Sequence, residues 1–322
     1  MNLFMKMSGA ILNSHDPFFN LTVEDYLLHK KAGDYLLLYF NDPSVIAGRH
    51  QILYREADVF TAESLGIPVI RRISGGGTVY HDRGNLNFTI IRNSQKGMQV
   101  DFSLHTRPVI EFLNKEGIPA IFSGKSDITV NGLKVSGNAE HVFRERVLHH
   151  GTLLFDTSTE IMSHLLRDAG DLYSTKAINS NRVPVMNLKS VLKNISTSDE
   201  LAFRIFDFMN SYFTGIDNLV LSEDDKTEIG ILAGSKYKTW EWNFGYSPPY
   251  EFTNTFEVCG ATHRISMYVK DGIIWRCTIE GSDLMSVKAK ELIGCRHDFK
   301  DIKNIFRSEK IQIDENEIKK FF

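Results

Sequence analysis

The sequence predicts an α+β fold, and three observations lead to this prediction. Helical patterns and strand-like runs mix along the chain without the strand–helix–strand rhythm of a doubly wound parallel sheet. Two pairs of strand-like runs flank glycine-containing turns, at Asn131-Gly132 and at Lys270-Asp271-Gly272, as in antiparallel hairpins. The segment 242–250, which holds two of the eight prolines, breaks the periodicity. We therefore expect a large unit over 1–247 and a small one over 248–322.

The first part of the chain is expected to combine helices with short strands. Asp16 and Pro17 predict the N-cap and the first turn of a helix that runs to about Lys31. Ser103 is expected to cap a second long helix, to Lys115, and a helix between these two ends near Gly66. Apolar and β-branched runs predict strands at 35–40, 44–49, 67–72, 78–81, 85–91 and 148–155.

From Thr159 onward the pattern becomes helical. Apolar residues recur at helical spacing over 161–169 and 200–213. Ser222 and Asp225 form a capping box before a third helix, which runs toward Trp240. Strands over 262–269 and 272–279 then form the second hairpin, and two or three helices are expected to follow it.

The composition argues against several classes of protein. The 322 residues carry a net charge of −3, whereas a general nucleic-acid binder needs a basic face. No apolar run approaches the roughly 18 residues of a membrane span, and the N-terminal residues lack the pattern of a signal or transit peptide. The three cysteines, Cys259, Cys277 and Cys295, lack metal-ligand spacing. We expect a cytoplasmic protein with reduced thiols and with neither a nucleic-acid nor a membrane partner.

The hairpin over 127–137 divides into an apolar and a polar face. With a type I′ turn at Asn131-Gly132, directly opposed residues share a face. The predicted pairs are Val130 with Leu133, Thr129 with Lys134, Ile128 with Val135, and Asp127 with Ser136. A solvent-exposed polar face is the simplest interpretation. The alternative is that Lys134 stabilises charge developing on a phosphorus or an acyl oxygen, and that Asp127 holds Mg²⁺.

A run of three glycines, Gly75, Gly76 and Gly77, follows Arg71-Arg72 and precedes T-V-Y-H-D. Glycine permits positive φ and lets a ligand approach the backbone, and successive N–H groups can form an anion-binding nest. The arginines supply charge that suits phosphate or carboxylate. A flexible hairpin tip with solvated arginines is the alternative. The charged and polar flanks favour an anion site.

Other catalytic and phosphate-binding motifs are absent. Gly124-Lys125-Ser126 has Pro119 where a Walker A loop needs glycine, and Tyr80 stands where a dinucleotide fingerprint needs its third glycine. No cysteine precedes position 259, and no Gly-x-Ser-x-Gly elbow surrounds Ser74 or Ser136. His149-His150 lies in a predicted strand, so the two imidazoles lie on opposite faces and cannot share one metal. For these histidines a structural role is favoured.

Six blocks resemble those of lipoate–protein ligases, in family order. R-R-I-S-G-G-G-T-V-Y-H-D-R-G-N-L-N (71–87) is similar to their R-R-x-S-G-G-G-x-V-[YF]-H-D-x-G-N block, and G-L-K-V-S-G-N-A (132–139) to their K-x-S-G-x-A segment. Further similar blocks lie at 47–51, 149–154, 181–188 and 240–248. The resemblance spans roughly 15–255, and a segment of the size of the family's accessory domain follows.

The resemblance implies both a fold and a reaction. The fold is that of biotin/lipoate ligases, with a large mixed-sheet catalytic domain (1–247) and a small α+β accessory domain (248–322). In the implied reaction, lipoate attacks the α-phosphorus of ATP, with Mg²⁺ as cofactor, and gives lipoyl-AMP and pyrophosphate. A lysine of an acceptor protein then takes the lipoyl group. The implied acceptors are lipoyl domains of 2-oxoacid dehydrogenase complexes and the glycine cleavage H protein.

The resemblance also implies roles for individual residues. Lys134 would bridge the lipoyl carbonyl oxygen and the α-phosphate, and Asp127 would be a magnesium ligand. The implied nucleotide-binding residues, besides Lys134, are Arg72, Gly75, Gly76, Gly77, Thr78, Val79 and Tyr80. The implied lipoate-binding residues are Arg72, His81 and Lys134.

Two departures from the family pattern and several alternatives accompany this interpretation. Ser126 replaces an Asn that precedes the Asp in the family, and Ile52 follows Gln51 where Asn is common. The nearest alternative is a lipoyltransferase that uses preformed lipoyl-AMP without making it. An octanoyltransferase would need a cysteine near Lys134, and a biotin ligase would need a basic glycine–arginine loop. A non-catalytic module that binds lipoylated partners is the alternative from a different class.

Overall fold

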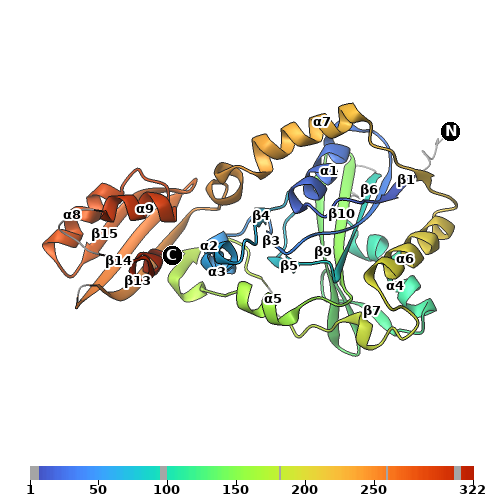
Figure 1. Cartoon of the computed structure of the whole chain (residues 1–322), viewed down its shortest axis with the longest axis horizontal. Coiled ribbons are helices and arrows are strands. Elements are labelled where there is room, and N and C mark those ends of the chain that lie inside the picture. The colour runs from blue at the N-terminus through green and yellow to red at the C-terminus, as the bar shows by residue number, and fades with distance from the viewer. Residues whose placement is uncertain (1–6, 95–99, 181–182, 259, 308–312) are drawn as a thin grey trace.

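The structure is a computed structural model that describes residues 7–94, 100–180, 183–258, 260–307 and 313–322. It consists of two bodies, which Figure 1 shows side by side along the long axis of the molecule. The larger body contains an eight-stranded and a three-stranded sheet, and the smaller body is built on a four-stranded sheet. The C-terminus lies between the two bodies (Figure 1), where Phe322 packs against Tyr54 with ring centroids 4.6 Å apart.

The eight-stranded sheet forms the centre of the larger body. Its strand order is β12-β1-β2-β6-β10-β9-β8-β7. β1 is parallel to β2 and to β12, and the other pairs are antiparallel, so the sheet is mixed. The strands are β1 (Ser8–Ile11), β2 (Tyr35–Phe40), β6 (Asn85–Asn93), β7 (Ala120–Ser123), β8 (Asp127–Val130), β9 (Leu133–Phe143), β10 (Arg146–Leu154) and β12 (Asp217–Asn218).

Helices cover both faces of this sheet, which explains why every residue of β2 is buried. On one face, Leu36 and Leu38 pack in a cluster with α4 (Phe102–Lys115) and α6 (Ser198–Tyr212). On the other face, Leu37 and Tyr39 pack in a cluster with α1 (Pro17–Lys30) and α7 (Glu223–Leu232). Figure 1 shows α1 and α7 together, away from α4 and α6.

The three-stranded sheet carries the glycine run. Its order is β4-β3-β5, and the run lies in the connection from β4 to β5. A small cluster that includes Val45, Tyr80 and Leu165 packs this sheet against neighbouring helices. The elements are β3 (Ser44–Ala47), β4 (Val69–Arg71), β5 (Val79–His81), α2 (Leu53–Glu56), α3 (Val59–Ser64) and α5 (Thr159–Leu165).

The smaller body is a sheet covered by helices on one face. Its sheet has the order β11-β13-β14-β15, and its edge strand β11 comes from before position 248. The elements are β11 (Tyr173–Thr175), β13 (Tyr250–Val258), β14 (Ala261–Lys270), β15 (Ile273–Glu280), α8 (Asp283–Leu292), α9 (Phe299–Phe306), α10 (Glu315–Ile318) and the 3₁₀ turn Lys319–Phe321. Elsewhere, 3₁₀ turns span Gly170–Leu172 and Leu188–Ser190, and π-helical turns span Ala233–Tyr237 and Glu241–Gly245.

Several predicted elements are confirmed, but one predicted helix N-cap is wrong. Asp16 caps α1 through a hydrogen bond from the Phe18 N–H, 2.9 Å, and the Ser222–Asp225 capping box precedes α7. The prediction that Ser103 caps α4 is wrong. Asp101 does so, accepting from the Leu104 N–H at 2.9 Å, because its carboxylate reaches that N–H from just before the helix. Cys277 and Cys295 are free thiols, whereas Cys259 lies outside the described residues.

The hairpin of β8 and β9 has the predicted turn but not the predicted register. Asn131 and Gly132 have φ of 52° and 80°, as a type I′ turn requires, and Thr129 pairs with Lys134. Beyond that pair the prediction is wrong, because Ile128 pairs with Ser136 and Asp127 with Gly137. Val135 is therefore an extra residue in a β-bulge. Ser136, which was predicted on the polar face, therefore lies opposite Ile128 and is completely buried.

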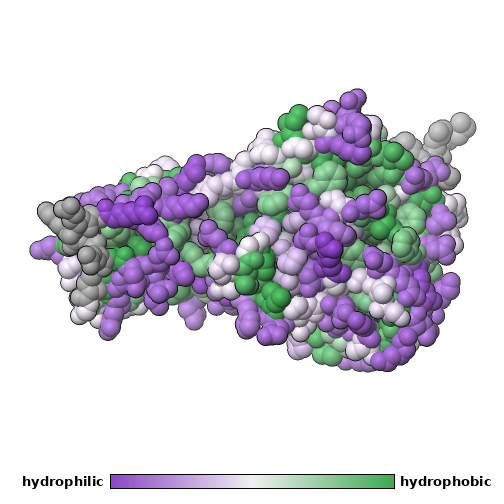
Figure 2. Space-filling model, in the orientation of Figure 1, coloured by the Kyte–Doolittle hydropathy of each residue, from purple (hydrophilic) through white to green (hydrophobic). Residues whose placement is uncertain are grey.

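No helix among the described residues has both the length and the hydropathy that a membrane span needs. Figure 2 shows hydrophilic residues over much of the visible surface of both bodies, with hydrophobic residues in smaller groups.

Candidate active site

A cavity of about 600 Å³ lies where the glycine run, the hairpin and β10 meet. Its wall combines apolar residues with polar and charged groups, which is typical of a small-molecule site. The residues predicted from the sequence that line it are Arg72, Gly76, Gly77, Thr78, Val79, His81, Asp127 and Lys134. Gly75 and Tyr80 do not line it. The Tyr80 side chain instead packs in the apolar cluster with Val45 and Leu165.

Lys134 and Asp127 form an ion pair at the wall of this cavity. The Lys134 Nζ lies 2.9 Å from Asp127 Oδ1, and each side chain is 21% exposed. Gly137 makes room for the lysine, because a Cβ at that position would lie 3.2 Å from Lys134 Nζ. The Lys134 backbone is fixed as well, since its N–H donates to Pro184 O and its carbonyl accepts from the Met186 N–H. These hydrogen bonds fix the backbone position from which the Lys134 side chain extends.

The Arg72 guanidinium is hydrogen-bonded to the backbone of the glycine run. It donates to the carbonyls of Gly77, at 2.8 Å, and of Gly75, as well as to Ile46 O. Burial lowers the pKa of Arg72 to about 10, so the group stays charged at neutral pH. Gly76 has φ of +85°, a conformation that favours glycine, and a Cβ at Gly48 would lie 2.0 Å from Gly76 O. The conformation of the run is therefore strongly determined by its surroundings.

Comparisons with known proteins identify the family. Residues 16–208 match the model of the family described as the lipoyl protein ligase A/B catalytic domain. The chain belongs to the lipoate–protein ligase family. It is 34% identical to lipoate–protein ligase LplJ of Bacillus subtilis, covering 84% of this chain and 82% of that one. It is 33% identical to lipoate–protein ligase 1 of Staphylococcus aureus, covering 90% of each chain.

Solved structures of lipoate ligases have the same fold. A bipartite lipoate protein ligase from Thermoplasma acidophilum, studied with its E2 lipoyl domain, has a TM-score of 0.65 at 22% identity and covers 75% of this chain and 97% of that one. The P. falciparum LipL1 in complex with lipoate has a TM-score of 0.62 at 23% identity, with 97% and 96% covered. The predicted fold class is confirmed, and the protein is a lipoate–protein ligase.

A buried polar chain supports the glycine run of this ligase. Arg72 Nε donates to Ser74 Oγ at 3.0 Å, and Ser74 Oγ lies 2.6 Å from His150 Nε2. His150 Nδ1 lies 2.9 Å from a carboxylate oxygen of Glu24, in the middle of α1. Because Arg72 Nε can only donate, the Ser74 hydroxyl accepts from it. The chain links α1 and β10 to the glycine run.

Glu24 is the negative end of this chain. Burial acts to raise the pKa of Glu24, but contact with His150 and the hydroxyls of Thr89 and Tyr39 lowers it overall. The carboxylate therefore balances the buried charge of Arg72. The Ser–His–carboxylate order resembles that of serine hydrolases, but Ser74 is completely buried and held by Arg72. The hydroxyl is thus placed for support of the run rather than for attack on a substrate.

Arg71, the other arginine before the run, does not face the cavity. Its guanidinium donates to the carbonyls of Gly48, Arg49 and Gln51 and to groups of the 242–247 segment, including Asn243 O at 2.6 Å. Arg71 is completely buried. The expectation that both arginines supply charge to an anion is thus wrong for Arg71, because backbone carbonyls occupy its donors.

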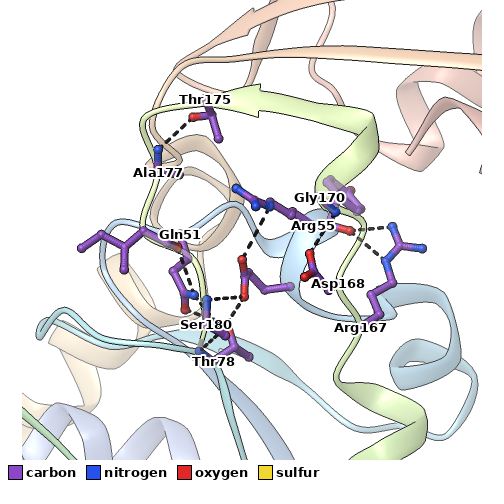
Figure 3. A network of polar contacts seen from close by, with 12 residues as sticks. Gln51, Arg55, Thr78, Arg167, Asp168, Gly170, Thr175, Ala177 and Ser180 are labelled. Carbon is purple, nitrogen blue, oxygen red and sulfur yellow. Dashed lines mark hydrogen bonds and ion pairs between the residues drawn. The ribbon is translucent and has the colours of Figure 1, made fainter. Parts of the chain in front are cut away.

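A second network of hydrogen bonds, shown in Figure 3, holds Thr78, which directly follows the glycine run. Gln51 accepts from Thr78 Oγ1 at 2.8 Å and donates to Ser180 Oγ at 3.0 Å. The Thr78 N–H also donates to Ser180 Oγ, and Ser180 donates to the Glu56 carboxylate. Residues 178–180 line the cavity. Ser180 lies close to Gly77, because a Cβ at Gly77 would lie 3.1 Å from Ser180 Oγ.

Two places in the ligase have the residue types of a metal site. Asp127 is the single carboxylate among the described residues that line the cavity. Mg²⁺ is usually held by one or two carboxylates together with substrate phosphates, so Asp127 fits such an ion. The other place is the buried group of His105, Glu140 and His149, whose ligand atoms lie within 4.8 Å of one another. There, both histidine Nδ1 atoms lie 2.9 Å from the same Glu140 oxygen, so hydrogen bonds account for the group.

The sequence did not single out Glu24 or Ser180 as site residues, and it placed Gln51 only in a family block. Glu24 carried one signal, because it is an acidic residue in the apolar stretch of a helix. Its partner His150 is 126 positions away in the chain. No local pattern connects the two.

Proposed function

We propose that this lipoate–protein ligase forms lipoyl-AMP at the Lys134 end of its cavity and then passes the lipoyl group to a lysine of an acceptor protein. In the first step a lipoate carboxylate oxygen bonds to the α-phosphorus of ATP, and the bond from that phosphorus to the bridging oxygen breaks, releasing pyrophosphate. In the second step the acceptor amine bonds to the acyl carbon, loses a proton, and AMP leaves. Both steps build negative charge on oxygen.

The observation that carries the proposal is the Lys134–Asp127 pair at the cavity wall, 2.9 Å apart. A fixed ammonium stabilises charge that develops on the non-bridging phosphate oxygens in the first step and on the acyl oxygen in the second. We assign Lys134 this role. Asp127 is assigned to Mg²⁺, which would neutralise phosphate charge when bound and leave the ammonium free to face the substrate.

The glycine run is assigned to the nucleotide. Gly76, Gly77, Thr78 and Val79 line the cavity, so a phosphate or ribose can approach their backbone closely. Arg72 is assigned a supporting role in addition to its charge, because its donors reach the carbonyls of the run. Gly75 and Tyr80 are assigned to the shape of the run rather than to ligand contact, since neither lines the cavity.

The acceptors are proposed to be lipoyl domains of 2-oxoacid dehydrogenase complexes and the glycine cleavage H protein. A lipoyl domain accompanies the structurally similar T. acidophilum ligase, which supports this class of partner. The assay is transfer of labelled lipoate to purified domains of each kind. A matched control is the same domain with its acceptor lysine replaced by arginine, which keeps the charge but removes the nucleophile.

The alternative is a transferase that accepts lipoyl-AMP but does not form it. Ligase relatives at 34% and 33% identity over most of the chain favour the complete reaction. ATP–pyrophosphate exchange separates the two, because exchange requires reversible adenylation. We expect lipoate-dependent exchange, with octanoate and biotin run in parallel. Transfer from added lipoyl-AMP without exchange would establish the alternative.

A further inference from the structure

His81, at the end of β5, is a cavity residue whose ring has an unpaired nitrogen. Its side chain lines the cavity and the residue is 4% exposed. Nδ1 lies 3.0 Å from Asn41 Nδ2, but Nε2 is buried and has no hydrogen-bond partner among the described residues. Buried polar groups are normally paired, so one left unpaired beside a cavity indicates a missing ligand atom.

The orientation of the Asn41 amide follows from its neighbour Asn20. Asn20 Nδ2 lies 2.9 Å from Ser14 O and 3.2 Å from Phe40 O, and carbonyl oxygens only accept. The same nitrogen therefore also donates to Asn41 Oδ1, at 2.9 Å. That contact leaves Asn41 Nδ2 to face His81. Both asparagines are completely buried, so neither amide is turned by solvent.

This relay assigns the tautomer of His81. Asn41 Nδ2 can only donate, so His81 Nδ1 accepts and the ring proton of the neutral imidazole is on Nε2. Burial, and then the charges of Arg72 and His150, lower the pKa of His81 to about 3. The ring is thus neutral at physiological pH, and its Nε2–H is a donor throughout the working range.

We propose that His81 binds an acceptor oxygen of the acyl or nucleotide substrate through Nε2–H, and that Asn41 is the positioning residue that keeps the proton on that nitrogen. The inference rests on the ligase activity and adds a specific donor to the site. A neutral donor of fixed direction suits an oxygen whose charge grows during adenylation, because it needs no reorganisation during the reaction. Asn20 sets the relay but touches neither the ring nor the cavity.

The groups around His81 make Asn41→Asp an informative change. Arg72 and His150 face the ring, with Glu24 bonded behind His150, and Asp82 is directed away to the N–H groups of Gly84 and Ser158. A carboxylate at position 41 would accept from Nδ1–H, which turns neutral Nε2 into an acceptor. Protonation of the ring would then restore the Nε2–H. The variant should therefore lose activity at high pH and regain it as the pH falls.

The experiment is lipoate-dependent ATP–pyrophosphate exchange by the full chain between pH 5.5 and 8.5. For Asn41→Asp we expect kcat/KM at pH 8 about tenfold or more below the wild type, with the ratio to the wild type rising toward low pH. The substrate whose KM changes, lipoate or ATP, identifies the oxygen. A ratio that does not change with pH would overturn the assignment. Wild-type exchange in the same series tests the ligase activity itself. A failure of the proposed function can therefore be told apart from a failure of the His81 assignment.

Two further measurements keep the test independent of stability. Asn187→Asp is the matched control, because the amide oxygen and nitrogen of Asn187 are both hydrogen-bonded, to the backbone of Thr157, and the residue does not line the cavity. We expect it to leave the pH profile unchanged. If Asn41→Asp does not fold, His81→Gln and His81→Leu replace it. Glutamine keeps an N–H near Nε2 and should retain more activity than leucine, and equal loss in both would contradict the proposal.

Discussion

His149 and His150 are neighbours on β10, yet each bonds a different buried glutamate on an opposite face of the sheet. His149 Nδ1 lies 2.9 Å from Glu140, toward α4, and His150 Nδ1 lies 2.9 Å from Glu24, in α1. Only the His150 branch continues through Ser74 to Arg72 and the glycine run. The two branches therefore form a natural pair of test and control.

Glu24→Gln should impair both stability and substrate binding. It removes the carboxylate that pairs with His150 and balances the charge of buried Arg72, and breaking a buried ion pair costs about 3 kcal/mol. The KM for ATP should rise together with the loss in thermal stability. Glu140→Gln should lower stability with a smaller effect on the KM for ATP, because its branch leads through His149 to Asn138 of the cavity wall and not to the glycine run. Equal KM values for the two variants would refute the supporting role of the Glu24 chain.

The glycines near the cavity should differ in their tolerance of alanine. Gly76 has φ of +85°, and its Cβ would lie 2.9 Å from Arg72, so Gly76→Ala should cost about 1–3 kcal/mol and weaken ATP binding. Gly48→Ala should be at least as severe, because its Cβ would meet the Gly76 carbonyl. Gly75→Ala is the control, since a Cβ there meets no atom within 4 Å. Thermal unfolding and ATP titration measure both effects, and similar results for Gly75 and Gly76 would contradict the geometry.

Arg71 should matter for folding rather than for charge at the cavity. Arg71→Leu leaves the carbonyls of Gly48, Gln51 and Asn243 without their donor, and should lower the free energy of unfolding by about 3 kcal/mol or more. Arg71→Lys should recover only part of this, because one ammonium cannot reach all these acceptors. Denaturant unfolding measures the free energy of unfolding of both variants and so checks this order of stability. Full stability of Arg71→Lys would show that charge alone suffices.

Acid should destabilise the fold through Asp25. Burial raises the pKa of Asp25, but the hydrogen bond with His29 and the charge and hydrogen bond of Lys236 outweigh it and lower the pKa to about 2, from 3.8. A lowered carboxylate pKa stabilises the folded state above the unfolded pKa, so about 2 kcal/mol is lost as the pH falls from about 4 toward 2. Asn at position 25 should lower stability at neutral pH and remove this part of the slope. An unchanged slope in Asp25→Asn would assign the acid sensitivity to other groups.

The elements that depend on neighbouring residues could be predicted from the sequence. The Asp16 cap, the type I′ turn at Asn131-Gly132 and the capping box at Ser222 are set by side chains within three positions. Each of these features satisfies its hydrogen bonds or its φ values locally, so no distant contact can override it.

The features that depend on distant contacts could not be predicted. The bulge at Val135 accompanies the pairing of Lys134 with the 184–186 segment, which no hairpin rule includes. Arg71 binds residues more than 170 positions away, and β11 joins the sheet of the smaller body across the proposed boundary at 247. That boundary stays a prediction. In each case the partner is chosen by tertiary packing.

Exchange by a Lys134 variant tests the central claim most directly. Lys134→Met keeps an unbranched apolar side chain but removes the ammonium that lies 2.9 Å from Asp127. Thr129→Val, directly opposite on β8, is the matched control. We predict that Lys134→Met folds with near wild-type thermal stability and loses lipoate-dependent ATP–pyrophosphate exchange by about a hundredfold or more, whereas Thr129→Val keeps it. Near wild-type exchange by Lys134→Met would contradict the assignment of Lys134 as the cation that serves adenylation.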